Sequence, residues 1–223
     1  REGITLDEVQ QKVKMSPYAV RVLVEAGLGM GLITLNEGKY KATKAAYFIL
    51  HDEMTRVNMD FTHDVCYQGM FFLDESLKRG KPEGLKVLGD WKTIYEGLST
   101  NFPEQAKKSW LSFDHYYSDY SFPQVLPLVF ERKPKTLLDI GGNTGKWTMQ
   151  CFAYDPDVNI TIMDLPGYVD GARTRMEAAG FGNRISFYPN NVLDESKPFP
   201  QGFDAIWMSQ FLDCFSEAEI TSI

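Results

Sequence analysis

The stretch T-L-L-D-I-G-G-N-T-G at residues 136–145 decides the fold of this chain. Its first half, Thr136 to Ile140, is an apolar run with one acid, which predicts a buried strand. Its second half, Gly141 to Gly145, predicts a tight turn, because glycine adopts positive φ at little cost and asparagine is the non-glycine residue best suited to it. Open α/β sheets build a nucleotide site where a strand leads through such a turn into a helix.

Strands and helices continue to alternate after this turn. Four strands are expected in all, at residues 136–140, 159–163, 185–188 and 203–208. Two helices are expected between them, at residues 146–154 and about 167–179. This order predicts a parallel sheet of the βαβ type, and thus an α/β Rossmann-like domain. Four strands would leave the last one as an uncovered apolar edge, so we expect the sequence to be a fragment that is truncated after its fourth strand.

The N-terminal part predicts a different architecture. Thr5 and the pair Ser16-Pro17 are typical helix starts, and a hairpin is expected from Leu32 to Thr43. Helix, turn, helix and hairpin is the winged-helix plan, which often binds DNA. Residues 1–50 carry seven basic and five acidic side chains, which is weak for a DNA reader, so packing or dimerisation is favoured. We expect a winged-helix and connector domain at residues 1–103 and a Rossmann-like domain at residues 104–223.

Composition excludes several other classes of protein. The 223 residues are 43% hydrophobic and 24% charged, which indicates a folded chain rather than a disordered one. The net charge of −7 argues against a surface built to coat nucleic acid, and the longest apolar run, Val125 to Phe130, is too short to span a membrane. Cys66, Cys151 and Cys214 lack metal-site spacing, so we expect reduced thiols, no bound metal and a cytoplasmic location.

The residues around the glycine-rich turn predict a nucleotide cofactor. Asp164 follows the second expected strand, where its carboxylate would accept hydrogen bonds from both ribose hydroxyls. The glycines are spaced as G-G-N-T-G at residues 141–145, which departs from the dinucleotide fingerprint G-x-G-x-x-G. The cofactor is therefore not expected to be NAD.

Five segments carry a resemblance to one family. Residues 138–145 resemble motif I of class I S-adenosylmethionine (SAM) methyltransferases, and Ile162-Met163-Asp164-Leu165-Pro166 resembles the D-L-P variant of motif II. Residues 113–121, F-D-H-Y-Y-S-D-Y-S, look like the motif F-N-x-x-M-S-D-H-S. With the winged helix and residues 203–208, they resemble small-molecule O-methyltransferases of the caffeic-acid and hydroxyindole type, whose N-terminal winged-helix domain dimerises.

The resemblance implies a function and a set of site residues. It implies transfer of a methyl group from SAM to an oxygen, or less readily a nitrogen, of a small aromatic acceptor, with S-adenosylhomocysteine (SAH) as product and a homodimer formed through the N-terminal domain. The cofactor-binding residues that it implies are Gly141, Gly142, Asn143, Gly145, Asp164, Leu165, Asn191, Val192, Ser209 and Ser121. Among these, Gly141 would contact the methionyl part of SAM, and Asn191 with Val192 would lie beside the adenine.

The family's general-base histidine has no counterpart here. Without a gap, the motif M-K-W-x-x-H-D-W-S-D places Asp213 at the histidine position, which makes Asp213 the expected base. A one-residue gap places Leu212 there and keeps Asp213 opposite the family's aspartate. His115 is a substitute base or a structural residue. A second hypothesis is a non-catalytic SAM-responsive regulator that binds DNA through the winged helix.

Overall fold

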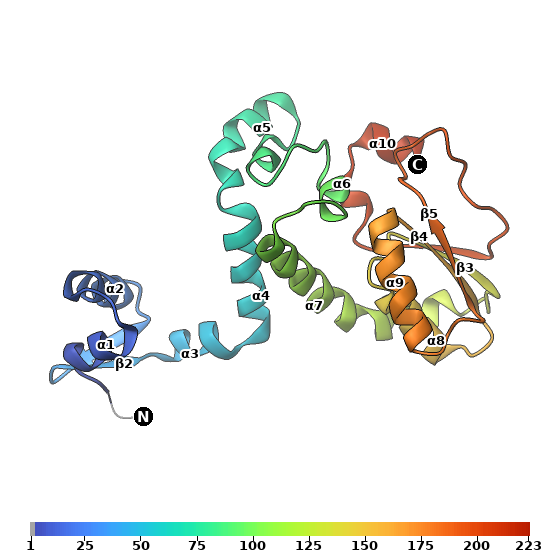
Figure 1. Cartoon of the computed structure of the whole chain (residues 1–223). Coiled ribbons are helices and arrows are strands. Elements are labelled where there is room, and N and C mark those ends of the chain that lie inside the picture. The colour runs from blue at the N-terminus through green and yellow to red at the C-terminus, as the bar shows by residue number, and fades with distance from the viewer. Residues whose placement is uncertain (1–2) are drawn as a thin grey trace. The chain divides into compact units, whose positions relative to one another are not determined.

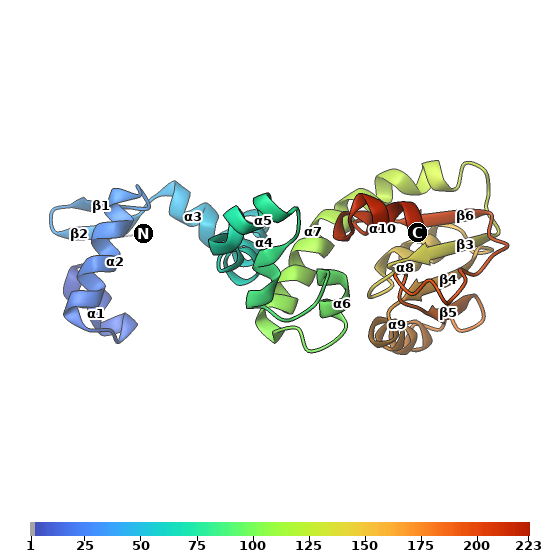
Figure 2. The ribbon, with the colours of Figure 1, turned by 90° about the horizontal axis from the view of Figure 1, so that it is seen from above.

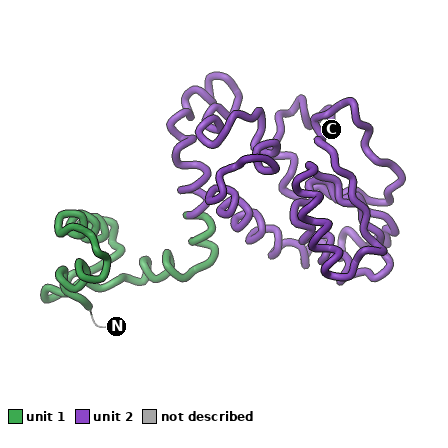
Figure 3. Tube along the Cα trace, in the orientation of Figure 1, with its two compact units in different colours: residues 1–59 green, residues 60–223 purple. Residues whose placement is uncertain are grey.

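The computed structural model describes residues 3–223, which form two compact units. The first ends at Met59 and the second runs from Asp60 to Ile223 (Figure 3). The domain boundary that we expected near residue 103 lies inside the second unit. One reason is that Asp64 accepts hydrogen bonds from Gln105 Nε2, at 2.9 Å, and from Ser109 Oγ, which joins residues on both sides of that boundary.

The first unit has the predicted order of helix, helix and hairpin (Figures 1 and 2). Its elements are α1 (Leu6–Val13), α2 (Pro17–Gly29), β1 (Ile33–Asn36), β2 (Lys39–Ala42) and α3 (Lys44–His51), with α4 (Glu53–Phe61) continuing into the second unit. Thr5 caps α1 in a capping box with Glu8, and Ser16 caps α2. The hairpin turns at Glu37 and Gly38, which both have positive φ, as two-residue hairpin loops require.

The second unit begins with helices and ends with a parallel sheet (Figure 1). Its helical part comprises a π-helix (Thr62–Cys66), 3₁₀ helices (Gly69–Phe72 and Glu83–Val87), α5 (Leu73–Arg79), α6 (Ile94–Leu98) and α7 (Glu104–Val129). Its α/β part comprises β3 (Thr136–Ile140), α8 (Lys146–Tyr154), β4 (Asn159–Asp164), α9 (Pro166–Ala178), β5 (Ile185–Pro189), β6 (Ala205–Met208), a 3₁₀ turn (Leu212–Cys214) and α10 (Glu217–Ser222). The four strands and two helices predicted here are confirmed.

The sheet has the order β5-β4-β3-β6, and every strand pair in it is parallel. Ile140 at the end of β3 pairs with Met163 of β4 and Met208 of β6, so these strands end at one level. Leu137 and Ile160 face a core shared with α7, α8 and α9, and Leu138 and Ile140 face a second core on the other side. The carboxyl edge of β3 and β4 is thereby held between two packed layers.

The last strand, β6, lies at the edge of the sheet, as expected. On one face Trp207 stacks on Trp147 of α8, with ring centroids 4.1 Å apart. On the other face Ile206 is 59% exposed and Met208 is 40% exposed. Within residues 3–223, no helix combines the length and the apolar character that spanning a membrane requires.

Candidate functional site

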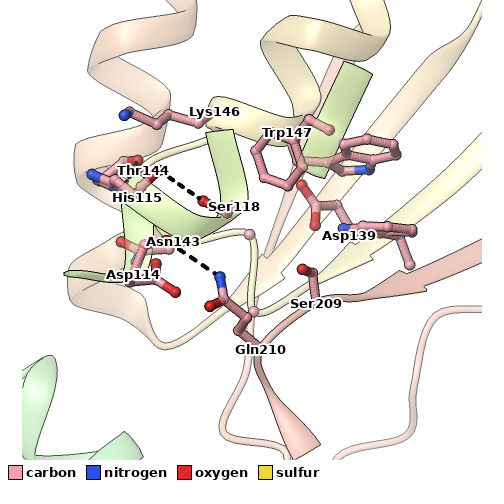
Figure 4. Close-up of a pocket in the computed structure, with 14 residues that line it drawn as sticks. Asp114, His115, Ser118, Asp139, Asn143, Thr144, Lys146, Trp147, Ser209 and Gln210 are labelled. Carbon is pink, nitrogen blue, oxygen red and sulfur yellow. Dashed lines mark hydrogen bonds between the residues drawn. The ribbon is translucent and has the colours of Figure 1, made fainter. Parts of the chain in front are cut away.

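A pocket opens at the carboxyl edge of β3 and β6, against α7 (Figure 4). It is lined by α7, the ends of β3 and β6, the glycine-rich turn, the start of α8 and the segment after β6. The polar side chains in its wall are those of Asp114, His115, Ser118, Asp139, Asn143, Thr144, Lys146, Ser209 and Gln210. These residues lie up to 96 positions apart, as in the contact from the Gln210 side chain to the Asp114 carbonyl, so only the fold brings them together.

The glycine-rich turn has the backbone conformation that the sequence predicts. Gly141, Asn143 and Gly145 have φ of 71°, 49° and 76°. At Gly141 a Cβ atom would lie 2.3 Å from the ring of Phe211. This position therefore requires glycine both for its positive φ and for lack of space. At Gly142 a Cβ would lie 3.0 Å from Asp139 Oδ2. The turn is therefore packed against the protein behind it and presents its open side to the pocket.

Asp164 holds the turn from behind. Its Oδ2 accepts a hydrogen bond from the Asn143 N–H at 2.8 Å, and its Oδ1 accepts one from the Leu165 N–H at 2.7 Å. The side chain is only 3% exposed, and burial raises the pKa of Asp164 to about 6 despite these two bonds. The acid at the end of β4 and the turn after β3, which the sequence analysis singled out separately, are thus joined by a hydrogen bond.

Asp139, at the end of β3, forms the inner wall of the pocket. Its carboxylate is 2% exposed and accepts a hydrogen bond from Thr148 Oγ1 at 2.8 Å. The pKa of Asp139 is raised to about 7, mainly by burial, with the hydrogen bond from Thr148 lowering it and the charge of the nearby Asp164 adding to the rise.

Two side-chain contacts join α7 to the glycine-rich turn and to the start of α8. His115 Nε2 is hydrogen-bonded to Thr144 Oγ1 at 3.2 Å, and the Lys146 ammonium pairs with Asp119. Burial lowers the pKa of His115 to about 4, and Lys146 lowers it further, so the ring is neutral near pH 7. His115 is held on the turn through Nε2 and so serves to position it, and a group with a pKa of about 4 is a weak base, which weakens its candidacy as the catalytic base.

The two candidate acids differ in their surroundings. Asp114 lines the pocket and is half-buried, and its carboxyl has a pKa raised to about 6, first by burial and then by the charges of Asp213 and Asp119. Asp213 is exposed and is not among the residues that line the pocket. The role of Asp213 as base stays a prediction. Leu212, which a one-residue gap would place at the histidine position, packs against the buried cluster that contains Phe211 and Phe215.

The predicted cofactor residues fall into two groups. Gly141, Gly142, Asn143 and Ser209 line the pocket. Asp164, Leu165 and Val192 lie outside the pocket and are buried, in or beside a cluster that contains Tyr95, and Asn191 is half-buried next to them.

The two remaining predictions have structural partners. Gly145 begins α8, with Met176 directly behind it. Ser121 is exposed and donates to the Tyr117 carbonyl, whereas Ser118, one turn earlier, lines the pocket.

Sequence reasoning missed Ser118 and Tyr95. Ser118 and Ser121 both belong to the motif at residues 113–121, so the motif indicated a serine near the cofactor. Which of the two faces the pocket depends on the rotational phase of α7, which the sequence did not give. Tyr95 lies in a short helix within what the sequence showed only as a connector.

Taken together, the sheet, the turn and the acid at the end of β4 define a Rossmann-like nucleotide-binding domain that follows a winged-helix unit. Comparison with known families narrows this class. Residues 123–223 match the model of the O-methyltransferase domain, and residues 1–40 match that of a Dimerisation2-like domain. The chain therefore carries an O-methyltransferase domain at residues 123–223 and a Dimerisation2-like domain at residues 1–40, in agreement with what its motifs predicted.

Individual relatives are distant. The chain is 22% identical over 227 residues to L-tyrosine C(3)-methyltransferase of Streptomyces lavendulae, covering 100% of this chain and 61% of that protein. It is 23% identical to 3-hydroxy-5-methyl-1-naphthoate 3-O-methyltransferase of Streptomyces sahachiroi, covering 95% of this chain and 60% of that protein. The chain thus spans about three fifths of the length of these relatives.

Solved structures share the fold. The O-methyltransferase NcsB1, crystallised with SAM and 2-hydroxy-5-methyl naphthoic acid, superimposes with a TM-score of 0.76 at 20% identity. The match covers 99% of this chain and 67% of NcsB1. A SAM-dependent methyltransferase, SibL, matches with a TM-score of 0.63 at 20% identity, over 100% of this chain and 65% of SibL.

The buried acid Asp139 makes stability depend on pH. Its pKa in the folded state is raised to about 7, so the folded protein retains a proton that the unfolded chain loses near pH 4. The stability contributed by this proton is present at pH 4 and is lost as pH rises through 7. Asp139→Asn should therefore raise the melting temperature relative to the parent more at pH 8 than at pH 5, measured by circular dichroism. An equal difference at both pH values would contradict this, and Asp170→Asn on the surface of α9 is the control.

Proposed function

We propose that this chain belongs to a SAM-dependent methyltransferase that transfers a methyl group to an oxygen of a small aromatic acceptor. The observation that carries the proposal is the bond between the Asp164 carboxylate and the glycine-rich turn, within a domain of the O-methyltransferase family. The names of its relatives support an aromatic acceptor, since one acts on L-tyrosine and another on a hydroxynaphthoate.

The charges of the pocket suit a cationic cofactor. SAM carries a sulfonium and an ammonium group, and Asp139 and Asp114 both place carboxyl groups in the pocket wall. The cation there, Lys146, is already paired with Asp119. We assign the backbone of Gly141 to Asn143 and the Asp139 carboxylate to the methionyl end, and Asp164, Leu165, Asn191 and Val192 to the nucleoside. When bound, SAM supplies the electrophilic methyl group.

The main contribution of the protein to such a reaction is alignment. Holding an acceptor in line with a donor at near-attack distance contributes on the order of 7–11 kcal/mol. The contacts of His115 with Thr144 and of Lys146 with Asp119 fix α7 against the turn, so one wall of the pocket is rigid with respect to the other. To Asp114, which lines the pocket on this wall, we assign the role of accepting the proton of the acceptor hydroxyl.

The cofactor assignment predicts a loss of affinity on mutation of Asp164. Two charge-assisted hydrogen bonds from the ribose diol to Asp164 contribute roughly 2–4 kcal/mol to the binding free energy, because the contributions of the two bonds do not add fully. Asp164→Ala should weaken SAM binding by this amount in calorimetry, while Asp170→Ala should not change it. Equal affinity of the mutant and the parent for SAM, or tighter binding of NAD than of SAM by the parent, would refute the assignment.

The assignment of Asp114 as the base predicts a pH-dependent rate. A base works only when deprotonated, so turnover should rise through about pH 6, the pKa to which Asp114 is raised. Asp114→Asn should lower kcat by about a hundredfold and remove this rise, with a much smaller effect on the Kd for SAM, to which Asp114 contributes only one of the pocket's acidic groups. Mass spectrometry of products from a panel of phenols, carboxylic acids and amines measures the rate. If Asp213→Asn gives this loss and Asp114→Asn does not, Asp213 is the base.

We also propose that the protein forms a homodimer. Residues 1–40 match a Dimerisation2-like domain, and each unit exposes large apolar side chains. In the first unit Tyr47, Phe48 and Leu50 of α3 are 49% to 61% exposed, and in the second unit Phe71 and Leu77 are both 76% exposed. Large apolar side chains that a helix exposes together, as α3 does, mark interfaces. No observation in either unit favours the alternative of a DNA-binding regulator.

The dimer predicts a molar mass of about twice the 25.4 kDa of one chain in light scattering at micromolar concentration. Replacing Phe71 and Leu77 by serine should shift the protein toward the monomer, because both side chains are 76% exposed and would be buried in the interface. Tyr154→Ser, on α8, is the control. A monomeric parent protein would count against the dimer.

A further inference from the structure

Three aromatic rings cover the carboxyl edge of β3 and β4 on the face opposite α8. We call Tyr95, Phe211 and Phe215 the aromatic cover. Tyr95 comes from α6, and the two phenylalanines flank the turn after β6. Each pair of rings meets edge to face, with centroids 5.1 to 5.4 Å apart, and each residue is 9% exposed or less.

The cover lies over the residues that we assign to the nucleoside of the cofactor. Tyr95 packs in one buried cluster with Leu165 and Val192. Asp164 is 3% exposed. The pKa of the Tyr95 hydroxyl is raised, first by burial and then by the charge of the nearby Asp164. The pocket reaches the glycine-rich turn but includes none of these residues. In this arrangement Asp164 is therefore closed to a ribose, and Tyr95 is packed beside it.

Beneath the cover lies a polar side chain without a partner. Asn190 follows β5 directly and is 1% exposed. Its backbone is bound on both sides: the N–H donates to the Asp164 carbonyl at 2.8 Å, and the carbonyl accepts from the Tyr95 hydroxyl at 3.5 Å. Its side-chain amide has no hydrogen-bond partner at either Nδ2 or Oδ1.

An unpartnered buried amide is energetically costly. Each unsatisfied donor or acceptor in a protein interior costs about 1–3 kcal/mol, so the closed arrangement carries a penalty at Asn190. The amide can donate two hydrogen bonds and accept two. A ligand that enters next to Asp164 and presents both a donor and an acceptor would remove this penalty.

We propose that the aromatic cover closes a nucleoside site, and that Asn190 is a specificity-determining residue within it. An entering adenosine group displaces the Tyr95 ring, and the Asn190 amide then hydrogen-bonds to it. This inference rests on the proposed SAM-dependent function and adds a recognition group and an entry step to it. No covalent change is involved.

Asn190→Leu tests the recognition group, because leucine has nearly the shape of asparagine without its polar atoms. The variant should raise the melting temperature of the free protein, since it removes the unsatisfied amide. It should also weaken SAH and adenosine by at least about tenfold in calorimetry, since it removes their partner. Asn183→Leu, at an exposed turn, is the matched control and should leave the affinity for SAH unchanged.

Tyr95→Ala tests the cover, and it has a readout that needs no ligand. Cys214 packs against the same cluster and is partly buried, whereas Cys151 is fully buried in the core on the other face. Tyr95→Ala should speed the alkylation of Cys214 by N-ethylmaleimide at least about fivefold, resolved by peptide mass mapping, with no change at Cys151. It should also speed SAH association in stopped-flow fluorescence. Tyr95→Phe, which keeps the ring, and Tyr154→Ala, on α8, should resemble the parent.

The outcomes separate this inference from the proposed function. If the parent binds SAH and Asn190→Leu binds it equally well, Asn190 is not a recognition residue and the inference fails while the function stands. A loss of melting temperature in Asn190→Leu also overturns it, because the amide is then satisfied within the protein. If neither the parent nor Tyr95→Ala binds SAH or adenosine, the SAM-dependent function fails and the inference fails with it.

Discussion

The structure of the site depends on one buried carboxylate. Asp164 binds the N–H of Asn143 in the turn after β3 and the N–H of Leu165 at the start of α9, and so joins the ends of two neighbouring strands. A carboxylate that is 3% exposed is costly to ionise, and these two hydrogen bonds offset part of that cost. The positive φ at Asn143 is maintained by this contact, because the N–H must point back toward β4.

Contacts from α7 hold the same turn from the other side. His115 and Asp119 bind Thr144 and Lys146, so the turn is fixed between the sheet and a long helix that precedes it in the sequence. The pocket exists because these two sets of contacts leave a gap between α7 and the turn. Since Lys146 is paired and His115 is neutral, the acidic groups Asp114 and Asp139 dominate the charge of the pocket wall.

The aromatic cover on the face of the sheet opposite α8 affects both the stability of the fold and access to Asp164. Burying three aromatic rings contributes several kcal/mol of hydrophobic stabilisation, and it also explains why Gly141 has no room for a side chain. The same rings cover Asp164 and leave the Asn190 amide without a partner. The region that would bind a nucleoside is therefore well packed but poorly satisfied in its hydrogen bonds, which is a physical basis for exchange between a covered and an open form.

Sequence alone determined the local structure of the α/β part. The apolar runs specified β3 and β4, and the demand for positive φ specified Gly141 and Asn143, because strand periodicity and backbone sterics act within a few residues. The importance of Asp164 also followed from its place after a strand.

Only the tertiary structure decided which side chains meet. It placed Asp114 in the pocket and Asp213 at the surface, chose Ser118 over Ser121, and brought Tyr95 across to Asn190. These outcomes depend on the phase of α7 and on the packing of α6 against the sheet, and contacts over 95 residues leave no periodic signal in the sequence.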